Sequence, residues 1–189
     1  MGMSTITHYI TLGFTHVVPF GYDHLLFILS LYLLNTGWRS VLIQCSVFTL
    51  AHSLSLGVAA IGGLDPATDM VEPLIAFSIV ITAMENILRP TLNRWRLLVV
   101  FGFGLVHGLG FASAIREVGL PGAEFLVALA SFNIGVELGQ LVVVLAAYVV
   151  LTHWFIDRPW YRARVVLPLS SLIACIAMYW TVERLLAGG

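Results

Sequence analysis

Six long apolar stretches, separated by short polar connections, limit what this chain can fold into. Each stretch has at least 18 residues, which is long enough for a helix to cross the hydrocarbon core of a bilayer. The whole chain is 59% hydrophobic and 10% charged, a balance that no water-soluble domain needs. We therefore predict one all-α domain over residues 1–189, a polytopic transmembrane helix bundle. The six predicted crossings cover residues 6–34, 40–60, 71–88, 97–114, 123–156 and 165–186.

The first stretch contains Pro19 close to its middle. Proline lacks the backbone donor of a helix and clashes with the preceding turn, so we predict a kink or break between His16 and Asp23. The piece before Pro19 is about a dozen residues, shorter than a comfortable crossing. We therefore favour one broken span. As a separate crossing, that piece would raise the count to seven.

The arginines set the expected orientation. The chain has no lysine, and seven of its nine arginines lie in every second connection. Because short cytoplasmic loops carry the excess of basic residues, we expect these connections in the cytoplasm and both termini outside. The expected location is the bacterial inner membrane. The seven arginines are Arg39, Arg89, Arg94, Arg96, Arg158, Arg162 and Arg164.

Five ionisable side chains, from four of the predicted crossings, are expected in the middle or outer half of the membrane. Each would cost roughly a few kcal/mol if it faced hydrocarbon, so groups at this depth indicate a functional site. Imidazole and carboxylate ligands suit Ni²⁺, Co²⁺, Zn²⁺ or Cu²⁺, whereas a Cu⁺ site would need clustered Cys or Met. One of the acids could instead orient a ligating imidazole through its second nitrogen. The predicted metal-site residues are Asp23, His24, His52, His107 and Glu137.

Further polar residues accompany the predicted ligands. Asn133, Glu137 and Gln140 step by four and three along one helix face, which is typical of a polar stripe. Glu85 precedes Arg89 by four residues, so we expect it to form a salt bridge at the cytoplasmic interface. The residues that we expect in a pathway or in interhelical contacts are His16, Ser53, Glu85, Asn86, Asn133 and Gln140.

The fourth crossing carries two glycines around its histidine. Gly104 and Gly108 are four residues apart, and His107 lies beside them. Such small-xxx-small spacing lets a neighbouring backbone approach closely. We expect a tight helix contact here, with His107 at mid-membrane.

Five motifs follow one another in the order found in a known family. In this combination the chain resembles the HupE/UreJ membrane proteins, particularly their second branch. The motifs are Gly-x-Asp-His-Leu-Leu-Phe at 21–27, Phe-Thr-Leu-Ala-His-Ser at 48–53, Val-Glu-Pro at 71–73 with Glu-Asn at 85–86, Phe-Gly-Leu-x-His-Gly-Leu-Gly-Phe-Ala at 103–112, and Phe-Asn-x-Gly-Val-Glu-x-Gly-Gln at 132–140.

The resemblance implies a small multi-spanning protein, associated with hydrogenase and urease accessory genes, that takes part in nickel or cobalt uptake. In the nickel-permease branch, a His followed after a short gap by Asp-His is regarded as needed for function. His16 with Asp23 and His24 is similar to this motif. The gap here is one residue longer than in that branch, and the second His-rich motif is reduced to His107.

Two functions of different kinds fit these residues. The first is a membrane transporter for a nickel- or cobalt-type divalent cation, captured from outside at His16, Asp23 and His24 and released past Glu85 and Asn86. The second is a zinc-dependent intramembrane hydrolase, in which an acid activates a metal-bound water against a lipid or peptide bond. An accessory subunit that hands metal to a partner is a third possibility, so catalysis is left open. We expect the lipid bilayer and a metal ion as partners and no nucleic acid, and we leave a homo-oligomer open.

Overall fold

The computed structural model of the protein describes residues 2–34, 37–62, 68–89, 95–111 and 124–188. Within these ranges the chain is helical and has no strand, and the prediction of an all-α membrane bundle is confirmed. The α-helices are α1 (Gly2–Val17), α2 (Tyr22–Leu34), α3 (Trp38–Gly62), α4 (Thr68–Leu88), α5 (Arg96–Gly110), α7 (Phe125–Ala147) and α8 (Leu167–Ala187). Two π-helical turns, η2 (Tyr148–Thr152) and η3 (Arg162–Val166), flank the connection between α7 and α8.

The first predicted span is broken at Pro19, as expected. Helices α1 and α2 end and begin on either side of it and are bent by 68°. The peptide bond between Val18 and Pro19 is cis. A Cβ atom at Gly21 would collide with the carbonyl oxygen of His16, so the turn needs glycine at this close approach of the backbone. The break brings the end of α1 and the start of α2 together.

Within the described residues, four helices are long and apolar enough to cross a membrane, and the bent pair α1 and α2 gives a fifth span when it is counted as one broken crossing. Helix α5 is apolar but has 15 residues; residues 112–114 of the predicted crossing at 97–114 lie outside the described residues. The count of six crossings therefore stays a prediction. Helix α7 continues through η2 to Thr152, which accounts for the unusual length of the fifth predicted stretch.

Two helix pairs pack so closely that their contacts require glycine. Helix α1 meets α7 at Gly13 and Gly135, where an added Cβ would collide with the partner's backbone. Helix α5 meets α3 in the same way, because a Cβ at Gly108 would collide with the carbonyl oxygen of His52. A Cβ at Gly104 would collide with the carbonyl oxygen of Phe48, also on α3. The predicted small-xxx-small contact is confirmed, and it holds α5 against the histidine of α3.

The outside of the bundle is apolar and the inside is partly polar. Leu50, Leu126 and Leu145 are 66%, 75% and 63% exposed, as suits a surface in contact with lipid. By contrast, His52 and Asn86 are fully buried. Buried polar groups in a bundle whose surface is hydrophobic are expected to pair with one another or to serve a function.

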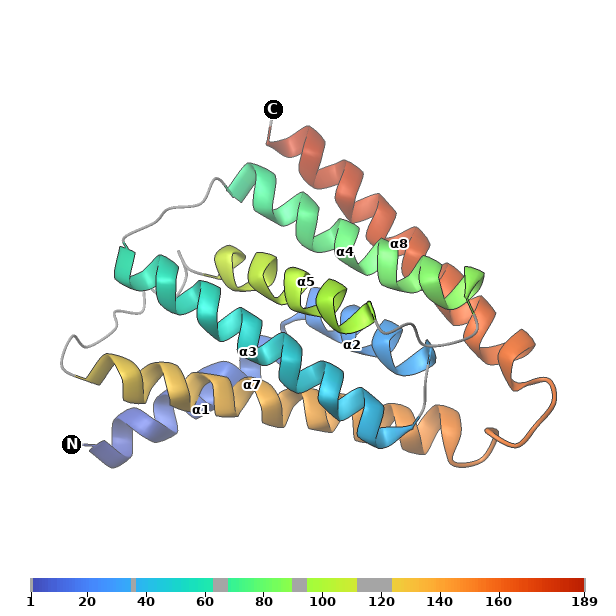
Figure 1. Cartoon of the computed structure of the whole chain (residues 1–189), viewed down its shortest axis with the longest axis horizontal. Coiled ribbons are helices and arrows are strands. Elements are labelled where there is room, and N and C mark those ends of the chain that lie inside the picture. The colour runs from blue at the N-terminus through green and yellow to red at the C-terminus, as the bar shows by residue number, and fades with distance from the viewer. Residues whose placement is uncertain (1, 35–36, 63–67, 90–94, 112–123, 189) are drawn as a thin grey trace.

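Figure 1 shows the N- and C-termini at the same end of the bundle. The start of α3, the end of α4 and the start of α5 lie at the opposite end. Arg39, Arg89 and Arg96 therefore share that end, in agreement with the pattern of connections that predicted the orientation. Arg94 and Arg116 lie outside the described residues.

Candidate metal centre

Three histidines from three helices meet inside the bundle. His16 lies in the last turn of α1, His24 in the first turn of α2 and His52 on α3. One ring nitrogen from each lies within 4.8 Å of the other two. The ring centroids of His16 and His24 are 4.6 Å apart, and both are 5.9 Å from that of His52. The break at Pro19 brings His16 and His24 together, because it places the end of α1 next to the start of α2.

Four of the six ring nitrogens of this group are buried without a hydrogen-bond partner among the described residues. This holds for Nε2 of His16, Nε2 of His24 and both ring nitrogens of His52. A neutral imidazole has one donor and one acceptor, and leaving them unsatisfied in a buried place costs free energy. A cation bound by the lone pairs would remove part of that cost. The donor set of three imidazoles therefore fits a borderline divalent metal ion.

Aromatic rings surround the three histidines. The ring centroids of Phe111 and His16 are 3.9 Å apart. The ring of Phe132 is stacked on that of His52, with 6.3 Å between the centroids. Phe48 contacts His24 edge-on at 5.7 Å. These apolar rings restrict rotation of the imidazoles and keep the dielectric constant low, which strengthens any ionic contact formed there.

His107 adjoins the group without being one of the three. Its ring centroid is 5.2 Å from that of His24, and its Nε2 lies 3.1 Å from Oγ of Ser78 on α4. Its Nδ1 is buried without a hydrogen-bond partner among the described residues. The close contact of α5 with α3 places His107 here.

A cavity of about 460 Å³ lies beside the histidines and is lined by His16, His24 and His107. It also carries three carboxylates and one guanidinium, so its net charge favours a cation. These charged residues are Asp23, Glu72, Glu183 and Arg184.

Asp23 lies at this cavity but is paired with an arginine. Its Oδ2 accepts a hydrogen bond from Nη2 of Arg184 at 3.0 Å, while Nη1 of Arg184 donates to the carbonyl oxygen of Glu72. The other oxygen of Asp23, Oδ1, is buried without a hydrogen-bond partner among the described residues. Asp23 is therefore near the histidines, with one oxygen engaged and one free.

The polar stripe of α7 lies along α3, and Glu137 does not join the histidine group. Ser46 donates a hydrogen bond to Glu137 at 2.7 Å, and Thr49 donates one to Gln140 at 3.2 Å. Asn133 donates to a backbone carbonyl of its own helix. The hydroxyl of Ser53, next to His52 in sequence, likewise donates to the carbonyl of Thr49.

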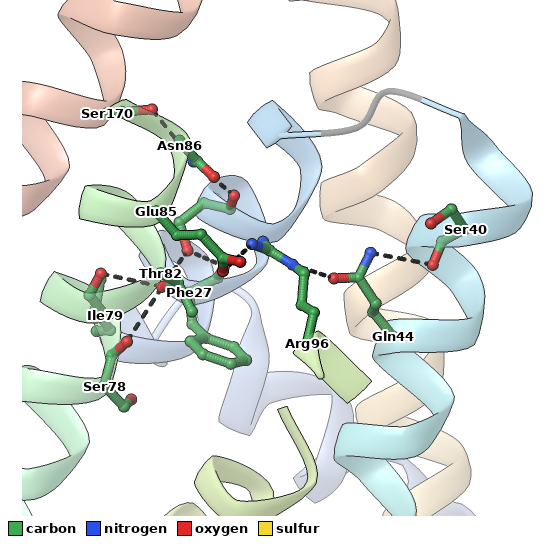
Figure 2. Close-up of polar contacts among 11 residues, drawn as sticks. Phe27, Ser40, Gln44, Ser78, Ile79, Thr82, Glu85, Asn86, Arg96 and Ser170 are labelled. Atoms are coloured by element: carbon green, nitrogen blue, oxygen red, sulfur yellow. Dashed lines mark hydrogen bonds and ion pairs between the residues drawn. The ribbon is translucent and has the colours of Figure 1, made fainter. Parts of the chain in front are cut away.

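Glu85 pairs with Arg96 on α5, whereas the sequence predicted Arg89 (Figure 2). The guanidinium is buried, and its Nε donates to Gln44 of α3 at 2.6 Å. A partner eleven residues away on another helix has no local signal in the sequence, unlike the four-residue spacing that suggested Arg89. The expected salt bridge thus exists with a different arginine, and it links three helices.

Asn86 holds the neighbouring helices together (Figure 2). Its Nδ2 donates to the carbonyl oxygen of Ser30 on α2 and to Oγ of Ser170 on α8. Ser30 is in turn 2.7 Å from the hydroxyl of Thr82 on α4. Asn86 therefore serves packing in this structure, and the hydroxyls of α4 form a polar seam towards His107.

Sequence reasoning missed the residues of α8 that reach the cavity. Arg184 and Glu183 follow an apolar stretch near the C-terminus, and no spacing links them to Asp23, which lies 161 residues earlier. His16 was expected only in a pathway, although it is one of the three histidines that meet. Its signal was present, because a break between His16 and His24 brings the two rings together.

Membrane-length helices, three converging imidazoles and an adjoining acidic cavity define a helical integral membrane protein with an intramembrane histidine cluster. The family model described as HupE / UreJ protein matches residues 1–184. The chain therefore belongs to the HupE/UreJ family, as its motifs predicted, and the family implies a membrane function related to metal uptake. No curated protein and no solved structure gave a significant match to the chain.

Proposed function

We propose that this protein carries a divalent transition-metal cation of the nickel or cobalt type across the membrane. The observation that supports this most is the group of three imidazole nitrogens, one each from His16, His24 and His52, within 4.8 Å of one another. Such nitrogen donors suit borderline divalent metals. Bringing them together from three helices also lets helix movement open and close the site, which passage of an ion requires.

The route that we propose begins at the acidic cavity. Its carboxylates would attract the hydrated cation from the outer side, where both termini are expected, and the histidines would then replace its waters. On the other side, the hydroxyls of Ser78 and Thr82 lead along α4 towards Glu85 and Asn86. We propose that the ion leaves along this seam. In this proposal the chain crosses the inner membrane six times, and the seam lies in the cytoplasmic half.

Uptake of radioactive Ni²⁺ into proteoliposomes tests the proposal. His24→Ala and His52→Ala are expected to reduce uptake by more than about tenfold, because each removes a ligand from the site. The matched control is His153→Ala, since the ring of His153 contacts Tyr148 and Trp154 instead of the cluster. Equal uptake by all variants, with normal amounts of folded protein, would contradict the proposal.

A second candidate is the zinc-dependent hydrolase. One observation favours it: three imidazoles adjoin a cavity that carries carboxylates, and catalytic zinc sites combine three protein ligands with an open position for water. In that case Asp23 or Glu72 would activate the metal-bound water, which would hydrolyse a lipid or peptide bond. An accessory protein that delivers metal to a partner would use the same ligands.

Metal exchange distinguishes transport from catalysis. A transported ion must leave its site, so its binding has to be reversible. Zn²⁺ that stays with the purified protein during dialysis against a chelator would favour the hydrolase. Free exchange of Ni²⁺ or Co²⁺ on a timescale of seconds would favour the transporter.

A further inference from the structure

Ser78 is a fully buried residue of α4 whose hydroxyl has two polar neighbours. Its Oγ lies 2.7 Å from the carbonyl oxygen of Ile75 and 3.1 Å from Nε2 of His107. A serine hydroxyl has one proton to donate and two lone pairs that accept. Because a carbonyl can only accept, the proton of Ser78 is donated to Ile75. The contact with His107 then needs its proton from the ring.

His107 therefore carries its proton on Nε2. In a neutral imidazole this leaves the lone pair on Nδ1. That nitrogen is buried and has no hydrogen-bond partner among the described residues. A buried acceptor without a partner is costly, so Nδ1 of His107 indicates a place where a ligand is expected.

The ring of His107 is held next to the proposed metal ligands. It stands at 90° to the ring of His24, with 5.2 Å between the centroids, and both line the cavity. The rings of Phe27 and Phe48 lie 5.3 and 5.0 Å from it. These contacts leave the imidazole little freedom to turn, so the hydrogen bond to Ser78 decides which nitrogen is bare.

We propose that Ser78 is a positioning residue that keeps His107 in the Nε2–H tautomer and thereby makes Nδ1 available as a fourth nitrogen donor. Ligating histidines commonly donate their other N–H to a polar partner that fixes the tautomer and raises the basicity of the ligand. A fourth donor would complete the tetrahedral shell that Zn²⁺, for example, takes. Only the role of Nδ1 as a fourth metal donor rests on the proposed function. The tautomer of His107 is a property of the protein without metal.

Nitrogen NMR of the histidine-labelled, metal-free protein in lipid nanodiscs tests the tautomer. The resonances of His107 are assigned by their loss in His107→Asn. We expect a protonated Nε2 and a bare Nδ1 in the wild type, and a mixture of both tautomers in Ser78→Ala. A protonated Nδ1 in the wild type, or the same tautomer in Ser78→Ala, would overturn the inference.

Ni²⁺ affinity, measured by calorimetry, tests the effect on binding. Ser78→Ala is expected to weaken binding by roughly 10- to 100-fold, as is usual for partners of metal ligands, and Ser78→Thr, which keeps the hydroxyl, to restore most of it. Thr181→Val is the matched control: it removes a buried hydroxyl of α8 that donates to the carbonyl oxygen of Ala177 and lies outside the proposed route. Equal losses in Ser78→Ala and Thr181→Val would overturn the inference by assigning the effect to helix packing.

The two readouts separate this inference from the proposed function. If the wild type binds no Ni²⁺ while His107 shows the bare Nδ1, the metal site fails and the positioning role of Ser78 is supported. If Ni²⁺ binds without shifting the Nδ1 resonance of His107, the metal site is supported and the fourth donor is overturned.

Discussion

An imidazole inside a membrane protein needs a partner for each ring nitrogen, and His52 has none for either among the described residues. In each of the two histidines beside it, Nε2 is likewise without a partner there. The adjoining cavity carries three carboxylates and one arginine. Asp23 is the acid nearest in sequence to this group, and half of its carboxylate is engaged by Arg184. The charge of Arg184 therefore opposes the binding of a cation at the cavity.

Removing this opposing charge is expected to strengthen metal binding. Arg184→Gln should raise the affinity for Ni²⁺ roughly threefold to tenfold at low salt. The guanidinium is partly exposed, so water screens its repulsion of a nearby cation to about 1 kcal/mol. Asp23→Asn should lower the affinity by a similar factor. Calorimetry with Arg39→Gln as the control measures both effects. A weaker affinity in Arg184→Gln would show that this arginine supports the site instead.

For single residues, the sequence predicted that histidines and acids would gather at a site. It did not identify every residue of the site. Ionisable groups inside apolar spans must find partners, and this reasoning led to His24, His52 and His107. It could not tell which of two acids belongs to the site. Asp23 lines the cavity, whereas Glu137 accepts a hydrogen bond from Ser46 where α7 meets α3. Both are acids at similar depth, and only the direction in which each helix face points distinguishes them.

Among the helices, α5 is short and carries His107, and it packs closely against α3. A Cβ at Gly108 would meet the backbone of α3, whereas a Cβ at Gly102 of the same helix would meet nothing within 4 Å. Glycine at position 108 is therefore a packing requirement, and glycine at position 102 is not.

Substituting the two glycines should give opposite results. Gly108→Ala is expected to lower the free energy of unfolding by about 1–3 kcal/mol through overpacking. Gly102→Ala should leave it unchanged or raise it by up to about 1 kcal/mol, because alanine favours helix. Thermal unfolding in detergent measures both. A loss of stability in Gly102→Ala as large as in Gly108→Ala would contradict the assigned contact.

The ion pair between α4 and α5 should be the costliest polar contact to break. Arg96→Met leaves the carboxylate of Glu85 without its partner and is expected to reduce stability by about 3–5 kcal/mol. Arg89→Gln, which removes the arginine that the sequence suggested, should have little effect. Unfolding measurements compare the two variants. A larger loss for Arg89→Gln would favour the local pair over the observed one.

The elements themselves were predicted more completely than their contacts. Apolar length placed the helices, and Pro19 marked the break, because both signals are local. The partners Glu85 and Arg96 meet only after α4 and α5 have packed against α3, so no local pattern could reveal them.

On the scale of the whole molecule, the residues that line the cavity come from the turn at Pro19, the first half of α4 and the end of α8. The start of α3, the end of α4 and the start of α5, which carry Arg39, Arg89 and Arg96, lie at the end of the bundle opposite the termini (Figure 1). A metal ion would therefore meet the acids first, then the imidazoles, and last the hydroxyl seam closed by Glu85 and Arg96. This order makes the orientation in the membrane part of the functional proposal.

Thiol labelling tests the orientation. In a background without Cys45 and Cys175, a cysteine at the exposed position Gly188 is expected to react with a membrane-impermeant reagent in intact cells. Asp157→Cys, between η2 and η3, should react only after the membrane is opened. Reaction of Asp157→Cys in intact cells, with Gly188→Cys protected, would reverse the proposed direction of entry.

The central claim is that His16, His24 and His52 hold one divalent ion between three helices. X-ray absorption spectroscopy of the purified protein loaded with one equivalent of Ni²⁺ measures this most directly. We predict the multiple-scattering signature of at least three imidazoles, with one imidazole fewer in His52→Ala. A spectrum with only oxygen neighbours, or one that the substitution leaves unchanged, would contradict the account.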